Sequence, residues 1–357
     1  MAKIKFTPRS LEYRAKQAIR LLGNPRGAPI TNVQLRAEAG DVKTSKQGAA
    51  YHNSYDPNAI RRVREKLDPE FMELVGKPAN GLPPMFCFHV TKGGTGKTSL
   101  ALNTAVAYAA QGYKVLLIDA DPQASVTEIL GIDSENEPDL QTLRNVLLHG
   151  VDPREAVVRI YDNAHLDLLP ADNTLNRFEK EIAADRMREM KFYNAVHREW
   201  KEFLSGYEVV IIDTNPSSST LNFNVMVAAS MIVGVVSLDG LSLKALTTVS
   251  NDVQDIESIL QRPVPVMLVA NKFHSGYKHC LENYNHLKTN YGDILCDSIV
   301  PVYTGFDRQV RIGNLQDNRP LFEDEPSSAP CEVILDISRL LLKRAIEGAS
   351  KFNEAKK

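Results

Sequence analysis

Short apolar runs, each followed by a polar or glycine-rich turn, recur along the chain from residue 85 onward. Four of them cover 86–90, 115–118, 209–212 and 264–270. An apolar run without alternating polar positions is typical of a strand that is buried on both faces of a sheet. Stretches with helical spacing separate these runs, and alternating strands and helices require a parallel sheet covered by helices on both faces. We therefore predict an α/β fold with a mostly parallel sheet.

Ahead of these runs, the chain shows the pattern of short amphipathic helices. Apolar residues recur at helical spacing within 8–22. Thr31 is a suitable N-cap for a second helix, a turn at Gly40 separates it from a third helix over 44–52, and Asp56 precedes a fourth. We expect the basic residues of the fourth helix to face the solvent: Arg61, Arg62, Arg64 and Lys66.

A proline-rich segment separates the two patterns. Residues 77–84 read Lys-Pro-Ala-Asn-Gly-Leu-Pro-Pro, and so many prolines and glycines cannot continue a helix. We expect a small helical domain over 1–78, a linker over 79–84 and the α/β domain over 85–357. A chain of 357 residues is long enough for one large and one small domain.

Charge is distributed unevenly between these parts. Residues 1–77 hold 15 Lys/Arg and 8 Asp/Glu, whereas residues 78–357 hold 27 and 36. Basic charge concentrated in one module is the expected footprint of nucleic-acid binding, and two short helices joined by a glycine turn suit a helix-turn-helix. The residues expected to face DNA at the start of the helix over 44–52 are Lys43, Ser45, Lys46 and Gln47. The alternative is a small helical bundle with a solvated basic face.

A glycine-rich turn after the first apolar run carries the clearest chemistry. Its glycines let the backbone approach phosphate oxygens, its N–H groups form a nest for anions, and a helix begins at its end. Lys97 can reach the β- and γ-phosphates, and the Thr98 hydroxyl can coordinate Mg²⁺. The predicted nucleotide-binding residues are Lys92, Gly93, Gly94, Thr95, Gly96, Lys97, Thr98 and Ser99.

One detail of this turn points to a family. In the usual G-x-x-x-x-G-K-[ST] pattern a glycine stands where this chain has Thr91, and the extra Lys92 follows. The segment resembles the deviant Walker A motif of the ParA/MinD group of P-loop ATPases, which includes the nitrogenase iron protein. The resemblance implies a P-loop NTPase fold and an ATP-bound sandwich dimer, in which Lys92 contacts the phosphates held by the partner subunit. A cation supplied in trans ties nucleotide state to dimerisation, as an arginine finger does.

Residues at the ends of three further apolar runs, two with carboxylates and one with an amide, also resemble the ParA/MinD group. Asp119 and Asp121 resemble the D-x-D-P-Q segment of ParA proteins, which implies that Asp121 orients the attacking water and Asp119 supports Mg²⁺. Asp213 follows an apolar strand in the Walker B layout and would hold Mg²⁺. Asn215 departs from the proline that is commoner there. Asn271 is implied to contact adenine, although it also suits a simple turn at a strand end.

The C-terminal part resembles the segment of ParA proteins in which basic residues bind DNA without sequence preference. The candidates are Arg308, Arg311, Lys343 and Arg344. Exposed arginines are also common as plain solvated charges. Larger ParA proteins carry an N-terminal DNA-binding domain, often with a leading dimerisation helix, and the segment 8–22 would fit that helix.

The favoured hypothesis is a ParA-type partition ATPase: a slow, Mg²⁺-dependent ATP hydrolase that forms a homodimer, binds DNA without sequence preference and is stimulated by a ParB-type centromere-binding protein. The N-terminal domain is a candidate for binding the operator and repressing the partition genes. The four cysteines form no C-x-x-C pair, which fits a reducing cytosol and counts against an iron–sulfur protein. We expect a cytoplasmic, nucleoid-associated protein without membrane binding. Two alternatives stay open: a transcriptional repressor that nucleotide only tunes, and a MinD-like positioning ATPase on membranes.

Overall fold

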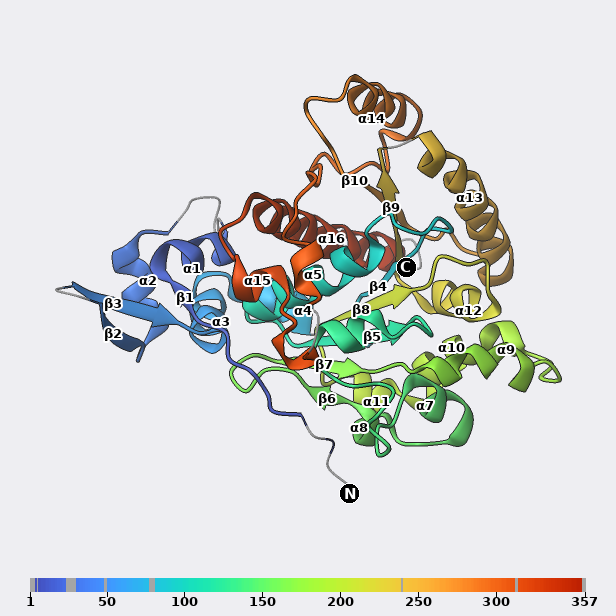
Figure 1. Ribbon diagram of the computed structural model, residues 1–357, viewed down its shortest axis with the longest axis horizontal. Coiled ribbons are helices and arrows are strands. Elements are labelled where there is room, and N and C mark those ends of the chain that lie inside the picture. Colours follow the sequence, from blue (N-terminus) through green and yellow to red (C-terminus); the bar gives the residue numbers. More distant parts are fainter. Residues whose placement is uncertain are drawn as a thin grey trace.

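The computed structural model describes residues 4, 6–23, 30–47, 50–76, 81–238, 240–311 and 314–354. Its centre is a seven-stranded sheet in the order β10-β9-β4-β8-β5-β7-β6 (Figure 1). All neighbouring strands are parallel except β6, which pairs antiparallel with β7. The strands are β4 (Met85–Phe88), β5 (Val115–Ala120), β6 (Val158–Arg159), β7 (Leu166–Leu169), β8 (Val209–Thr214), β9 (Met231–Ser237) and β10 (Val266–Asn271). The predicted α/β fold with a mostly parallel sheet is confirmed.

Helices cover both faces of the sheet because each central strand presents apolar side chains alternately to either side. Phe86, Leu117 and Ile211 belong to the core under α5 and α16, whereas Cys87 and Ile212 belong to the core on the opposite face. The first face carries α5 (Lys97–Ala110), α6 (Ser125–Ile129), α15 (Leu321–Asp324) and α16 (Ala329–Glu354).

The opposite face is built from a series of shorter helices and one long one. It carries α7 (Leu143–His149), α8 (Pro153–Ala156), α9 (Phe178–Glu181), α10 (Lys191–Asn194), α11 (Lys201–Leu204), α12 (Thr220–Ala228) and α13 (Gly240–Leu260). Beyond β10, α14 (Lys278–Tyr291) packs in a separate small core. Among the described residues, no helix has the length and apolar composition that a membrane crossing needs.

The N-terminal module contains a small antiparallel sheet as well as helices. Its elements are β1 (Tyr13–Arg14), α1 (Ala15–Leu22), α2 (Asn32–Ala39), β2 (Lys43–Gln47), β3 (Ala50–Tyr55), α3 (Pro57–Leu67) and α4 (Pro69–Gly76), with strand order β1-β3-β2. The prediction of a third helix over 44–52 is therefore wrong. The first helix also begins at Ala15 rather than near Pro8.

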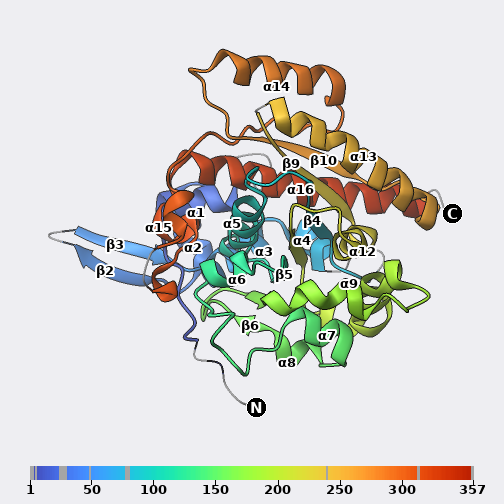
Figure 2. The same ribbon diagram turned by 45° about the vertical axis from the view of Figure 1, so that its right-hand side comes forward.

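The physical reason for the hairpin lies in both local preference and pairing. Thr44 and Tyr51 favour strands, and the segment has no apolar repeat at helical spacing. Tyr55 at the end of β3 is buried and pairs with Tyr13, so the strand gains a partner that is distant in sequence. Figures 1 and 2 show the β2–β3 hairpin projecting from the side of the molecule.

The fourth predicted helix is confirmed as α3, but two of its arginines do not face the solvent. Arg61 forms two hydrogen bonds of 2.9 and 2.8 Å with the buried carboxylate of Glu208 and another with the Gly112 carbonyl. Arg64 is only 6% exposed, donates to the Leu21 carbonyl at 2.9 Å and lies over the ring of Tyr113. These arginines therefore fasten the N-terminal module to the loop that follows α5.

The N-terminal module also shares one hydrophobic core with the α/β part. The cluster that contains Leu35 and Ile60 continues into Tyr108 of α5 and Leu341 of α16. The proposed division into domains at 79–84 stays a prediction, because the two parts pack together in this structure.

Candidate nucleotide-binding site

The P-loop joins the carboxyl end of β4 to the first turn of α5, as its sequence predicts. Gly94 and Gly96 have φ angles of +72° and +90°, which residues with a side chain rarely adopt. Gly96 is the N-cap of α5, so the first N–H groups of the helix face the turn. Gly93 and Gly94 are exposed, whereas Thr95 and Lys97 are buried. The predicted phosphate-binding residues from Lys92 to Ser99 therefore lie on one continuous loop and helix start.

Asp213 lies beside the P-loop because β8 is the sheet neighbour of β4. It pairs with Phe88 across the ladder and is completely buried. Neither of its carboxylate oxygens has a hydrogen-bond donor of standard geometry among the described residues. Burial, followed by the charge of Asp119, raises its pKa well above the usual range, against the opposing effects of Thr98 and Lys97.

Lys97 is the cation that faces these acids. It is 5% exposed, and burial lowers its pKa, while the charges of Asp213 and Asp121 act in the opposite direction. A buried lysine and a buried aspartate therefore lie close together where a triphosphate and its cation would enter, and burial shifts the pKa of each toward the neutral form. Such an arrangement is costly without a ligand and is typical of functional sites.

Asp119 and Asp121 lie at the end of β5, the neighbour of β8 on its other side. Asp119 pairs with Asp213 in the ladder, and burial raises its pKa to about 7. Its Oδ2 accepts hydrogen bonds from the Thr127 N–H at 3.0 Å and hydroxyl at 2.8 Å, and its Oδ1 accepts from the Asp121 N–H at 3.1 Å. Asp121 accepts from the Gln123 N–H at 2.8 Å, and burial raises its pKa.

These donor sets fit Mg²⁺ unequally. In the part of the chain that the structure describes, no three His, Cys, Asp or Glu side chains are grouped to hold a metal. Mg²⁺ usually takes only one or two protein ligands and completes its shell with phosphate and water oxygens. The oxygens of Asp213, which have no standard donor within the described ranges, and the nearby Thr98 hydroxyl suit that role. The oxygens of Asp119 are already engaged, so its predicted part in metal binding is a supporting one.

Asn271, the candidate adenine contact, packs against the P-loop itself. Its Nδ2 donates to the Thr95 carbonyl at 2.7 Å, and its Oδ1 accepts from the Lys272 N–H at 2.8 Å. A side chain at Gly96 would clash with this amide. The asparagine therefore holds the phosphate loop in place, and its contact with adenine stays a prediction.

Lys92, the predicted contact in trans, is partly buried at the start of the loop. The segment after Asp213 passes close to the next residue of the loop, because a Cβ added at Gly93 would lie 3.8 Å from Cγ of Pro216. Asn215, which replaces the commoner proline, accepts hydrogen bonds at its Oδ1 from the N–H and hydroxyl of Ser217. The amide thus closes a tight turn in place of proline.

The residues predicted to read DNA in the N-terminal module are not on a helix. Lys43, Ser45, Lys46 and Gln47 belong to β2, each paired with a residue of β3. Lys43 is exposed and forms an ion pair with Glu12 at 2.9 Å. The side chains of the other three lie outside the described part of the structure. Their assignment to a recognition helix is therefore wrong, while their contact with DNA stays untested.

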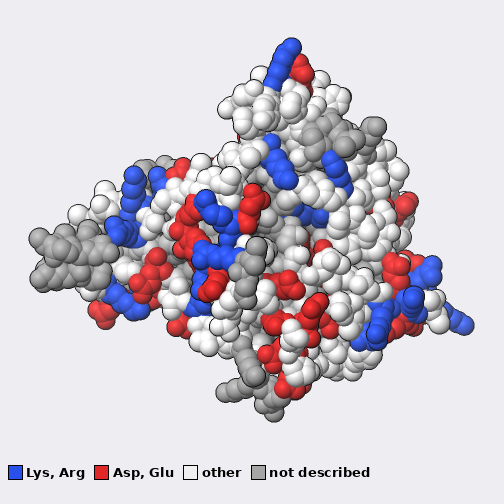
Figure 3. All heavy atoms as spheres, in the orientation of Figure 1, with Lys and Arg blue, Asp and Glu red and all other residues white. Residues whose placement is uncertain are grey.

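The basic residues predicted in the C-terminal part all lie at or near the surface. Arg308 and Arg311 are exposed and form ion pairs of 2.5 Å with Glu325 and Asp324. Lys343 is exposed near Glu347, and Arg344 is partly buried. Figure 3 shows that lysines and arginines on that face of the molecule are interspersed with carboxylates rather than gathered in one basic stripe.

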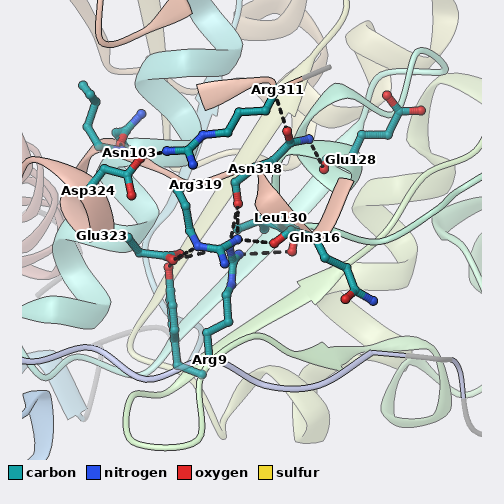
Figure 4. A network of polar contacts seen from close by, with 12 residues as sticks. Arg9, Asn103, Glu128, Leu130, Arg311, Gln316, Asn318, Arg319, Glu323 and Asp324 are labelled. Atoms are coloured by element: carbon teal, nitrogen blue, oxygen red, sulfur yellow. Dashed lines mark hydrogen bonds and ion pairs between the residues drawn. The ribbon is translucent and has the colours of Figure 1, made fainter. Parts of the chain in front are cut away.

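A polar network beneath Arg311 escaped the sequence reasoning (Figure 4). Glu323, whose side chain is 9% exposed, lies 3.3 Å from Arg9 and 3.4 Å from Arg319 and accepts a hydrogen bond from Tyr161. Arg9 also donates to the carbonyl groups of Leu130 and Asn318. The network fastens the N-terminal arm to the segment that carries the candidate DNA-binding arginines.

Asn103 connects that segment to the nucleotide site. It is completely buried in α5, donates to the Ser99 carbonyl at 2.8 Å and to Gln309 at 2.7 Å, and accepts from the Leu321 N–H at 2.9 Å. An asparagine among the alanines and leucines of a buried helix indicates a buried polar contact with another segment. The sequence analysis did not use this signal.

Comparisons with known proteins agree with this geometry. The family model described as "AAA domain" matches residues 85–265. The cell division protein PomZ of Myxococcus xanthus is 31% identical over 84% of this chain and 88% of its own length. A ParA family protein of Chlamydia trachomatis is 33% identical over 70% of this chain and 94% of its own length.

A solved structure shares the fold of the nucleotide-binding part. Cobyrinic acid a,c-diamide synthase from Mycobacterium smegmatis, with bound ATP analog and magnesium, superposes with a TM-score of 0.62 at 23% identity, over 74% of this chain and 95% of that chain. The matched family model, the relatives at 31% and 33% identity and the P-loop geometry agree: the chain belongs to the ParA family of the ParA/MinD superfamily of P-loop ATPases.

Proposed function

We propose that this protein is a partition ATPase that binds ATP with Mg²⁺, closes into a dimer around the nucleotide and hydrolyses it slowly. The observation that carries the proposal is the buried Asp213 side chain beside Thr98 and Lys97, whose oxygens have no hydrogen-bond donor of standard geometry among the described residues. Mg²⁺ would supply the positive charge that neutralises phosphate oxygens during hydrolysis. Similarity to ParA family proteins supports the role in DNA partition.

Each residue of the site has a distinct part in this proposal. Lys97 and the N–H groups of the loop hold the β- and γ-phosphates, and Thr98 with Asp213 would hold the cation. Asp121, aligned by the Gln123 N–H, orients the attacking water. Lys92 of a second copy reaches the phosphates and closes the dimer, so that nucleotide state controls assembly.

Binding to DNA would then depend on ATP. Arg308 and Arg311 are held by carboxylates in this structure, and phosphate contacts would replace these ion pairs. Asn103 joins their segment to Ser99 of the P-loop, which supports communication between the two sites. A ParB-type partner would stimulate hydrolysis and thereby release the DNA.

A second role, binding to an operator sequence, is favoured by the N-terminal module. The helices α1 and α2 are followed by the projecting β2–β3 hairpin, and α2 turns most of its surface to solvent. Val33 is 79% exposed, and Arg36 and Asn32 share the exposed surface of this short helix. A helix with an exposed apolar residue beside an arginine and an asparagine suits the major groove. We therefore place the operator-reading residues on α2 rather than on 44–52.

The proposal is tested by nucleotide binding and gel-shift assays on the full chain. Lys97→Ala is expected to abolish binding of a fluorescent ATP analogue with Mg²⁺, whereas Lys288→Ala, a change to an exposed lysine on α14, is expected to leave it intact. Shifts of random and upstream DNA are compared without nucleotide, with ADP and with ATP. Unchanged hydrolysis in Lys97→Ala would remove the site assignment, and random-DNA binding that ignores ATP would favour a plain repressor.

A further inference from the structure

Two carboxylates at the end of α15 lie against the two candidate DNA-binding arginines. Glu325 Oε1 lies 2.5 Å from a guanidinium nitrogen of Arg308, and Asp324 Oδ2 lies 2.5 Å from a guanidinium nitrogen of Arg311 (Figure 4 shows the second pair). Hydrogen bonds from Tyr303 and then Arg308 lower the pKa of Glu325, so its carboxylate is charged at neutral pH. The arginine side chains are 58% and 49% exposed, so a DNA backbone can reach them. Each arginine is thus already paired with an anion of the same chain, through the N–H donors that a phosphate takes.

The preceding acidic residue has a different part. Glu323 has a side chain that is only 9% exposed, and it is shared between Arg9 and Arg319. Arg319 also donates to two backbone carbonyl groups of its own segment. Glu323 therefore fastens α15 to its surroundings, while Asp324 and Glu325 face the exposed arginines.

The position of these carboxylates is fixed by buried neighbours. Leu321 and Phe322, the first two residues of α15, are 2% and 1% exposed. The Leu321 N–H donates to Asn103 Oδ1 at 2.9 Å. On the arginine side, Gln309 is 2% exposed and accepts from Asn103 Nδ2 at 2.7 Å. One asparagine of α5 therefore sets the position of the carboxylates relative to the arginine segment.

We propose that Asp324 and Glu325, here called the acidic mask, inhibit DNA binding by competing with DNA phosphates for Arg308 and Arg311. A phosphate must displace a carboxylate that the fold holds in place, and the displaced carboxylate stays close enough to repel it. The two arginines therefore add little to DNA affinity while the mask is closed. The inference rests on the proposed function in one respect, because it takes these arginines as DNA contacts.

The contacts of Asn103 give nucleotide a route to the acidic mask. Its Nδ2 also donates to the carbonyl of Ser99 at 2.8 Å, in the first turn of α5. Nucleotide held by the P-loop would contact this turn, and a shift of the turn would reach Gln309 and Leu321 through the same amide group. Their spacing, and with it the spacing between arginines and carboxylates, would then depend on nucleotide. This route needs the proposed ATPase function, whereas the masking does not.

Masking is tested by fluorescence anisotropy with a labelled random-sequence DNA duplex and the full chain without nucleotide. The unmasked variant combines Asp324→Asn and Glu325→Gln, which remove both charges and keep the side-chain size. We expect about tenfold tighter binding, from about threefold for each exposed ion pair released. The slope of log affinity against log salt should steepen by about 1.8, because two arginines gain phosphate contacts. Unchanged affinity in a variant that circular dichroism shows to be folded overturns the proposal.

The matched control removes two carboxylates of the same segment that have no ion-pair partner among the described residues. Asp307 directly precedes Arg308, Asp317 follows Arg311 by six positions, and both acids are exposed. Asp307→Asn with Asp317→Asn changes the net charge by the same amount and is expected to raise the DNA affinity less than twofold. An equal gain in the control would assign the effect to net charge and overturn the mask.

A further variant identifies the groups that are released. Arg308→Ala and Arg311→Ala, added to the unmasked variant, are expected to remove the whole gain in DNA affinity. A gain that persists would show that the DNA binds elsewhere and would overturn the proposal.

The route from nucleotide is tested by repeating the titrations with Mg²⁺ and a non-hydrolysable ATP analogue. The parent should gain more DNA affinity from the analogue than the unmasked variant, whose arginines are already free. Equal gains would overturn the route through Asn103. The nucleotide-free titrations need no ATP binding, so failure of the mask and failure of the ATPase proposal are separate results.

Discussion

Replacing Asp213 by asparagine is expected to stabilise the protein in the absence of Mg²⁺ and nucleotide while removing its function. The side chain is fully buried, neither oxygen has a standard donor in the part of the chain that the structure describes, and its pKa is raised well above the usual range. A group whose pKa is raised on folding adds stability only below its unfolded pKa of about 4, and that stability is lost as pH rises toward the folded pKa. An asparagine side chain at this position does not titrate and escapes this loss.

The size of the effect follows from proton linkage. Within the window between about pH 4 and the folded pKa, the native state holds one proton more than the unfolded state, which costs about 1.4 kcal/mol for each pH unit. Two pH units therefore cost about 2.8 kcal/mol. With an unfolding entropy of about 2.1 cal/mol/K per residue, 357 residues give about 0.75 kcal/mol/K, so the Tm advantage of Asp213→Asn should grow by about 4 °C.

The assay is thermal unfolding of the parent and Asp213→Asn between pH 5 and 8, without and with Mg²⁺ and a non-hydrolysable ATP analogue. The variant should melt higher without ligand, with a gap that widens as pH rises, and it should lose most of the ligand-induced increase seen in the parent. Asp119, whose pKa burial raises to about 7, titrates nearby in both proteins, so the comparison between parent and variant isolates the contribution of Asp213. A variant that melts lower than the parent at every pH would refute the reasoning. It would show that other groups already stabilise the Asp213 carboxylate in the folded protein.

Three further outcomes follow from the same contacts. Lys92→Ala should still bind Mg²⁺ and the ATP analogue but lose nucleotide-dependent dimerisation in analytical ultracentrifugation; a normal dimer would show that Lys92 does not act in trans. Arg61→Ala should lower the free energy of unfolding, measured in urea, by about 3 kcal/mol, because it leaves the buried Glu208 carboxylate without its ion-pair partner. Adding Glu208→Gln should recover part of that loss. No recovery would show that the loss does not come from the unpaired Glu208 carboxylate. Arg36→Ala should weaken upstream-DNA binding about tenfold in gel shifts while leaving nucleotide binding unchanged, and equal binding would remove α2 as the reading helix.

The sequence was sufficient for the elements whose chemistry is local. The P-loop glycines, Lys97 and Thr98 lie within one short segment, and their geometry follows from positive φ angles and a helix start. The strands that end in Asp119 and Asp213 are uninterrupted apolar runs, and parallel pairing brings their ends together. Each of these inferences needed only nearest neighbours along the chain and a rule for parallel sheets.

The errors in the N-terminal module have one physical origin. The hairpin over Lys43–Tyr55 is stabilised by pairing of β3 with β1 and by burial of Tyr55. Tyr13 of β1 and Tyr55 of β3 are far apart in the sequence, so local patterns do not reveal their pairing. Likewise, Arg61 and Arg64 have the spacing of a solvated basic face, yet they dock on Glu208 and Tyr113. The basic composition therefore predicts more positive charge on the DNA-facing surface than the module has, because two of its arginines hold the module in place.

Buried hydrogen-bond acceptors without a partner among the described residues lie on both sides of the strand end that carries Thr214. On one side, the oxygens of Asp213 have no donor of standard geometry among the described residues, and the proposed Mg²⁺ would bind there, beside Lys97 and the P-loop. On the other side, His89 Nε2 and Asn222 Oδ1 are buried and have no hydrogen-bond partner among the described residues. Buried polar groups without a partner lower stability, and here they come from three segments that meet around the end of β8. The proposed Mg²⁺ would supply the charge that Asp213 lacks, and His89 connects the opposite side to the same strand end through its 2.8 Å contact with the Thr214 hydroxyl.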